Sequence, residues 1–265
     1  MTRLILLGLF ILTSVGHAEP WRITTEPFPP YFAPNLKNQG WLSEVTLTAL
    51  KEQGIEAQIE FVQWSRAMKL AQSGQRTAVL GAYYKQSRAS QFLYSVPVAE
   101  SHTGLIQRRN GKLSFNGELT SLKPYVISKG ENYAVSEAFD NAPFLSITRT
   151  RDLPTSLYML LRGRVELVAG THEVAKYWLS HDDRLTELGG LKKVEFIKPE
   201  LATHRLYLIF PIVDAESEQR RKTFAIGMKK LANSDELTDI LSRHGFSLSE
   251  QQQYKQRILD SAFSP

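Results

Sequence analysis

The segments MKLAQSGQRTAVLGAYY (residues 68–84) and LYMLLRGRVELVAGTHE (residues 157–173) repeat one pattern along the chain. Each contains an apolar helix, a glycine, an apolar strand and a second glycine at the strand end. A glycine after the last helical turn provides the positive φ that ends a helix, and a glycine at a strand end lets another group approach the backbone. The repeat indicates two similar lobes that face one another, although helix–glycine–strand units also occur in α/β proteins generally.

The elements around the first segment alternate between strand and helix. Apolar periodicity predicts strands at 21–25, 55–62 and 77–84 and helices at 41–53 and 64–71. Because short loops join them, the pattern predicts an α/β fold in which a mostly parallel sheet has helices on its faces. In such open sheets the ligand binds at the carboxyl ends of the strands. The loop Glu26-Pro27-Phe28-Pro29-Pro30-Tyr31 follows the first strand at such an end, and its prolines make it rigid.

The second half of the chain continues this alternation. Strands are expected at 104–109, 125–128, 146–150 and 206–212, and two helices with apolar faces follow the last strand. Asp152 and Pro154 are typical of a helix start, and Gly130-Glu131-Asn132 is expected to open another helix. No linker is long or polar enough to separate freely moving domains, so two closely joined lobes are expected.

The first eighteen residues are expected to be a signal peptide rather than part of the fold. Arg3 supplies a positive start, Leu4–Val15 is an apolar stretch, and Gly16-His17-Ala18 provides a small-residue cleavage site before Glu19. The stretch is shorter than a membrane-spanning helix needs. Because the chain has no cysteine, neither a lipoprotein anchor nor a disulfide framework is expected. The mature protein is therefore expected in the periplasm.

The charge pattern argues against nucleic acid as a partner. The formal net charge is +5, but the basic residues are scattered and form no stripe with interleaved aromatic residues. The six histidines include no H-x-x-x-H or H-E-x-x-H pair, and the chain has no P-loop, G-x-G-x-x-G or G-x-S-x-G motif. Neither a metal site nor a cofactor is expected.

Several segments, in this order, resemble the extracellular solute-binding proteins of family 3, which have the type II periplasmic-binding fold and are best known from polar amino-acid uptake. These segments are ITTEPFPPYF, FVQWSRAMKLAQSG, AYYKQSRASQFLYSVPV, SKGENY, LLRGRVELVAG and KKLANSDELTDILSRHGF. The resemblance extends over essentially the whole mature chain. It implies a lobe 1 made of residues 19–100 and 204–265 and a lobe 2 made of residues 101–203. Two hinge strands, near 100–104 and 201–206, would let the lobes close on a ligand.

Arg88 is the first ligand-binding candidate, because the resemblance places it where the family holds a ligand carboxylate. A guanidinium binds a carboxylate through two parallel hydrogen bonds; the alternative is a solvated surface arginine. The resemblance also implies that Gly81, Ala82 and Tyr83 line the ligand site, with Tyr83 in place of a smaller residue. Trp64 is expected either to stack on the ligand or to belong to the core.

Further candidates lie on other segments: Arg66, Glu26, Phe28 and Tyr31 in lobe 1, and Gly130 and Asn132 in lobe 2. Arg66 is expected either to reach the cleft or to lie on the surface. The acid and the two aromatic residues of the proline-rich loop are expected at the cleft mouth, unless they are packed surface. The helix start predicted at Gly130 offers backbone N–H groups to an anion, with Asn132 as side-chain donor, or is an ordinary N-cap.

Thr171 and His172 stand where amino-acid binders of the family usually have an aspartate that pairs with the ammonium group of the ligand. An ammonium group in a dry cleft needs an anion or several acceptors. Thr171 and a neutral His172 supply less than an aspartate, and Glu173, one residue further, is the alternative. An α-amino acid is therefore compatible with the sequence but not implied by it.

These features predict a non-enzymatic, periplasmic solute-binding protein that closes two lobes on a small polar or anionic solute, an amino acid or a related carboxylate. The expected partners are this solute and a membrane permease of the ABC type, and the chain is expected to be a monomer. One alternative is a dehydratase-like enzyme on the same scaffold, with His172 and Glu173 as acid–base candidates. The other is a ligand-sensing partner of a membrane receptor.

Overall fold

The computed structural model describes residues 19–131 and 133–261. The expected signal peptide and Asn132 lie outside the described residues. The predicted alternation of strand and helix is confirmed. The strands expected at 21–25 and 146–150 have those bounds, and the helix Leu153–Leu161 (α5) follows the N-cap Asp152, whose side chain accepts a hydrogen bond from the backbone of Thr155.

The described residues form one nine-stranded sheet in the order β2-β1-β3-β9-β4-β7-β5-β6, with β8 paired to β4. Strand β1 pairs in parallel with β2 and β3, and β5 pairs in parallel with β6 and β7. Each lobe therefore has a parallel group of strands at its centre, as the sequence predicts. The strands are β1 (Trp21–Thr25), β2 (Ala57–Phe61), β3 (Ala78–Tyr83), β4 (Phe92–Arg108), β5 (Val126–Gly130), β6 (Ser146–Thr150), β7 (Leu167–Thr171), β8 (Val194–Phe196) and β9 (Ala202–Pro211).

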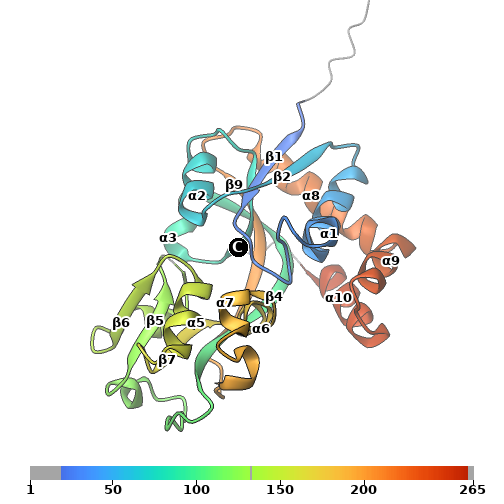
Figure 1. Ribbon diagram of the computed structural model, residues 1–265. Helices are drawn as coiled ribbons and strands as arrows, with labels where there is room; N and C mark the ends of the chain where they lie inside the picture. The colour runs from blue at the N-terminus through green and yellow to red at the C-terminus, as the bar shows by residue number, and fades with distance from the viewer. Residues whose placement is uncertain (1–18, 132, 262–265) are drawn as a thin grey trace, which may run out of the picture.

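Strands β4 and β9 run antiparallel to each other and join the two lobes (Figure 1). The sequence predicts strands at 104–109 and 206–212, and the resemblance adds hinge strands near 100–104 and 201–206; β4 is a single strand of 17 residues that extends further toward the N-terminus and has irregular register around Pro97. These two strands form the hinge. The predicted lobe boundaries at 100/101 and 203/204 fall inside them and stay a prediction.

Helices cover both lobes, and those at 137–140, 172–181, 183–186 and 248–260 were not predicted. Helix α10 follows the two predicted C-terminal helices; Tyr254 of α10 donates to the carbonyl of Val98 in β4 at 2.8 Å, which fixes the helix to the hinge strand. In the described part of the chain, no helix is both long and apolar enough to cross a membrane. The helices are α1 (Trp41–Lys51), α2 (Trp64–Gln72), α3 (Gln86–Ala89), α4 (Glu137–Asp140), α5, α6 (His172–His181), α7 (Asp183–Thr186), α8 (Ser217–Ala232), α9 (Asp235–Arg243) and α10 (Leu248–Asp260).

Apolar side chains bury both faces of the sheet. The largest cluster includes Leu80 in lobe 1 and Leu157 in lobe 2. Two smaller clusters, around Ile127 in lobe 2 and Ile209 in lobe 1, cover the opposite faces. The strand ends between the lobes are therefore held by a core on each side.

The helix start predicted at Gly130 is wrong. Gly130 is the last residue of β5, and α4 begins only after the N-cap Ser136. The ring of Tyr133 packs against Gly130, where a Cβ would lie 2.6 Å from the ring. Asp140 accepts a hydrogen bond from the backbone N–H of Val135 at 3.0 Å. These contacts stabilise a non-helical loop between β5 and α4, so no helix N-terminus faces the cleft at Gly130.

Candidate functional site

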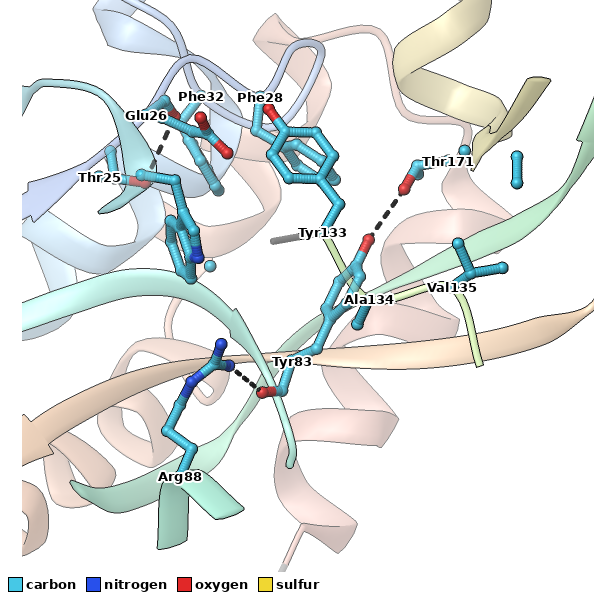
Figure 2. A pocket seen from close by; sticks show the side chains of 14 residues that line it. Thr25, Glu26, Phe28, Phe32, Tyr83, Arg88, Tyr133, Ala134, Val135 and Thr171 are labelled. Carbon is cyan, nitrogen blue, oxygen red and sulfur yellow. Dashed lines mark hydrogen bonds between the residues drawn. The ribbon is translucent and has the colours of Figure 1, made fainter. Parts of the chain in front are cut away.

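A cavity with an empty volume of about 620 Å³ lies between the lobes, at the carboxyl ends of β1 and β3 on one side and of β7 on the other. This is where a ligand is expected in an open α/β sheet. The predicted residues that line it are Glu26, Phe28, Trp64, Gly81, Tyr83, Arg88 and Thr171, and those not predicted include Thr25, Phe32, Tyr133, Ala134, Val135 and Ala169 (Figure 2).

The strand-end glycines of the two repeated segments both border this cavity. Gly81 has a φ of +86°, and a Cβ there would lie 2.3 Å from the ring of Phe32. A Cβ on Gly170 would lie 2.7 Å from the Cδ1 atom of Leu153. Both glycines therefore let an apolar side chain approach the end of a strand. The repeated pattern shapes the walls of the cavity from both lobes.

Arg88 brings a positive charge to the cavity from the short helix α3. Its Nη1 atom donates to the carbonyl oxygen of Tyr83 at 2.6 Å, a bond drawn in Figure 2. Its guanidinium lies 5.7 Å from the ring centroid of Trp64. Among the described residues it has no carboxylate partner. A guanidinium held in place by a carbonyl and an aromatic ring, and left without an anion, is suited to bind a carboxylate.

Glu26 brings a carboxyl group, and among the described lining residues it is the one acid. Burial raises the pKa of Glu26 from 4.5 to about 7, offset in part by hydrogen bonds from Tyr133 and from the backbone of Trp64 and reinforced by the charge of Asp152. Its ionised form is therefore poorly compensated by the surrounding protein. A cationic group at this point would compensate it.

Tyr83 connects the lobes across the cavity. Its hydroxyl forms hydrogen bonds with Ser101 of β4 at 2.8 Å and with Thr171 at the end of β7 at 2.9 Å, and Figure 2 draws the bond to Thr171. Its ring stacks on His204 of β9 with centroids 4.2 Å apart. One side chain from lobe 1 thus contacts both hinge strands and lobe 2, and the Thr171 hydroxyl is already engaged.

Several predicted residues do not line the cavity. Tyr31 is buried, and its hydroxyl donates to a backbone carbonyl of β4 at 2.7 Å. Arg66 is exposed on α2, and Ala82 is fully buried in the core of lobe 1. Gly130 lies under the ring of Tyr133. Asn132 lies outside the described residues, so its expected role stays a prediction.

The acid–base pair His172 and Glu173 also lies away from the cavity lining. His172 is buried against Phe196, with ring centroids 5.0 Å apart, and burial lowers its pKa from 6.5 to about 4. Glu173 accepts from the backbone N–H of His102 at 3.1 Å and contacts the Nδ1 atom of the same residue at 2.6 Å. Glu173 therefore binds the hinge strand β4 rather than replacing the missing aspartate.

A second cavity, with an empty volume of about 1040 Å³, adjoins the first. The two share the side chains of Glu26, Phe28, Tyr133 and Thr171, so these residues stand between them. In the described part of the chain, no group of three or more histidine or acidic side chains is arranged to hold a metal ion.

The two-lobe α/β fold, with two strands joining the lobes and a cavity between them, agrees with the fold that the sequence predicts. The chain belongs to the bacterial extracellular solute-binding proteins, family 3, whose family model matches residues 22–247. The resemblance stated from the sequence is confirmed, and helix α10 lies beyond the matched residues.

Solved structures share this fold over most of the chain. One is the arginine-, lysine-, histidine-binding protein ArtJ from Geobacillus stearothermophilus, 17% identical with a TM-score of 0.71, over 90% of this chain and 100% of that one. A substrate binding protein of an amino acid ABC transporter is 15% identical with a TM-score of 0.70, over 86% and 99%. A histidine kinase sensor domain is 16% identical with a TM-score of 0.69, over 92% and 98%. None of the curated proteins compared by sequence matches the chain.

Proposed function

We propose that this chain is a periplasmic solute-binding protein that closes its two lobes on a small carboxylate-bearing solute and passes it, as a monomer, to an ABC-type transporter. The observation that carries the proposal is Arg88, whose guanidinium lines the inter-lobe cavity and has no carboxylate partner among the described residues. A ligand carboxylate at this point would form charge-assisted hydrogen bonds with the Arg88 guanidinium.

The transporter role is supported by the family and by similarity to the substrate binding protein of an amino acid ABC transporter. Similarity to the histidine kinase sensor domain supports one alternative, in which the closed lobes signal to a membrane receptor. The dehydratase-like alternative has no comparable support, because its candidates His172 and Glu173 do not line the cavity.

Thermal unfolding of the mature chain, from Glu19 onward, tests the proposal. The panel pairs each carboxylate with its neutral amide, for example glutarate with glutaramide and acetate with acetamide, and adds neutral sugars. A carboxylate present at 100 times its Kd is expected to stabilise the chain by about 2.7 kcal/mol, and its amide is expected to have no effect. Stabilisation by amides or sugars but by no carboxylate would refute the proposal.

A further inference from the structure

The cavity contains two opposite charges that do not neutralise each other. Arg88 and Glu26 both line it, yet within the described residues neither forms an ion pair, with the other or with any further charged side chain. In Figure 2 the Glu26 carboxylate lies at the upper left and the Arg88 guanidinium at the lower left, both to the left of the Tyr83 ring. A carboxylate and a guanidinium that share one cavity without an ion-pair partner are suited to a ligand that carries both a cationic and an anionic group, separated by a spacer.

The position that would hold an α-ammonium group is filled by neutral groups. Thr171 stands where the resemblance places an acid, and its hydroxyl is hydrogen-bonded to Tyr83 at 2.9 Å. Glu173, the nearest acid along the chain, is bound to His102. An ammonium group beside Thr171 would therefore lose its water without gaining an anion, which is unfavourable.

The surroundings of Glu26 suit a cation. Phe28, Trp64 and Tyr133 line the same cavity, and the backbone of Trp64 and the hydroxyl of Tyr133 hydrogen-bond to the Glu26 carboxyl. Aromatic faces attract ammonium and guanidinium groups, and the attraction is stronger where water is excluded. The ring of Trp64 already faces the Arg88 guanidinium, so the carboxylate of Glu26 and the rings of Phe28 and Tyr133 are the groups suited to a ligand cation.

We propose, building on the proposed function, that the solute is a carboxylate with a remote cationic group and no required α-amino group, as in an ω-amino or ω-guanidino acid. Arg88 binds the carboxylate, Glu26 binds the cation, and the intervening methylene groups lie against the aromatic walls. Tyr83 and Thr171 form a neutral, hydrogen-bonded pair where the resemblance places the acid that binds an α-ammonium group.

Isothermal titration of the mature chain with matched ligands tests the proposal. Each set contains an ω-amino acid, the α,ω-diamino acid, the α-amino acid without the ω-amine, and the plain carboxylate; for six carbons these are 6-aminohexanoate, L-lysine, L-norleucine and hexanoate. Sets of four, five and six carbons are compared, and the length that binds tightest is used. The ω-amino acid is expected to bind at least as tightly as the diamino acid and at least about tenfold more tightly than the two ligands without the ω-amine.

The Glu26→Gln variant provides the second arm. It is expected to weaken the binding of the ω-amino acid at least about tenfold and the binding of the plain carboxylate less than threefold, because only the ω-amino acid carries the cation. For the wild type, the ω-amino acid is expected to bind about tenfold more weakly at pH 6 than at pH 8, since the pKa of Glu26 is about 7. The neighbouring groups do not titrate in this window, since the pKa of Tyr133 is raised and that of Asp152 is lowered.

The outcomes separate this inference from the proposed function. If the diamino acid binds more than tenfold tighter than the ω-amino acid, an α-ammonium group is recognised and the inference is overturned, while the proposed function stands. The same holds if Glu26→Gln weakens the ω-amino acid and the plain carboxylate equally. If no carboxylate of any set binds, both the inference and the proposed function are overturned.

Discussion

Replacing Glu26 by glutamine measures the cost of ionising a carboxyl group inside the inter-lobe cavity. Burial raises the pKa of Glu26 from 4.5 to about 7. The stability that the neutral carboxyl contributes is therefore fully present below pH 4.5 and is lost as the pH rises through 7. The loss is about 3 kcal/mol at pH 8 and below about 1 kcal/mol at pH 5. Since glutamine cannot ionise, the free energy of unfolding of Glu26→Gln, relative to that of the wild type, is expected to rise by about 2–3 kcal/mol from pH 5 to pH 8.

Urea unfolding of the ligand-free mature chain at pH 5 and pH 8 provides the measurement. Taking the difference between the two pH values removes any cost of the substitution that does not depend on pH. Glu187→Gln is the matched control, because Glu187 is an exposed acid at the end of α7; its difference is expected to stay within about 0.5 kcal/mol. An equal effect of Glu26→Gln at both pH values would refute the account of a buried, uncompensated carboxyl.

Three further substitutions test the packing around the cavity. Gly81→Ala is expected to lower the free energy of unfolding in urea by about 2–4 kcal/mol, because Gly81 has a φ of +86° and its Cβ would lie 2.3 Å from Phe32. Gly54→Ala is the control: Gly54 has a φ of +70° but no atom within 4 Å, so about 1–2 kcal/mol is expected, and equal costs would contradict the contact with Phe32. Tyr83→Phe removes two hydroxyl hydrogen bonds, so it is expected to lower the free energy of unfolding by about 1–3 kcal/mol and to increase the radius of gyration of the ligand-free chain in small-angle X-ray scattering. No change in either quantity would argue against the contact between the lobes. Burial lowers the pKa of His172 from 6.5 to about 4, so the stability that its neutral form contributes is present above pH 6.5 and is lost as the pH falls through 4. Between pH 7 and pH 5, the free energy of unfolding of His172→Leu should therefore fall by about 2 kcal/mol less than that of the wild type. Equal losses would show that His172 is not buried in its neutral form.

The first-lobe half of the site was predictable because its residues are close in sequence. Gly81 and Tyr83 lie in the last residues of β3 and Arg88 in the short helix α3 that follows, and local patterns predict a strand end and the next helix start. The spacing therefore brings them to one wall of the cavity. Arg66 illustrates the limit of this reasoning, because it follows Trp64 by two residues on α2, yet its side chain points to solvent while Trp64 lines the cavity.

The second-lobe half depends on long-range contacts that no local pattern contains. The loop with Tyr133 and Val135 is held in place where His204 of β9 hydrogen-bonds to the Val135 carbonyl at 2.6 Å. Sequence reasoning expected a helix there because a glycine and polar residues are typical of a helix start. Glu173 likewise turns to His102, a partner 71 residues away.

The most direct test of the central claim compares Arg88→Ala with Arg66→Ala by isothermal titration, using the carboxylate that stabilises the wild type most. Both substitutions remove an arginine from lobe 1, but only Arg88 lines the cavity. Arg88→Ala is expected to weaken binding at least about thirtyfold, because the ligand carboxylate loses its charged partner in a desolvated site. Arg66→Ala is expected to change the affinity less than threefold. Unchanged affinity in Arg88→Ala would contradict the account, since the carboxylate would then be held elsewhere.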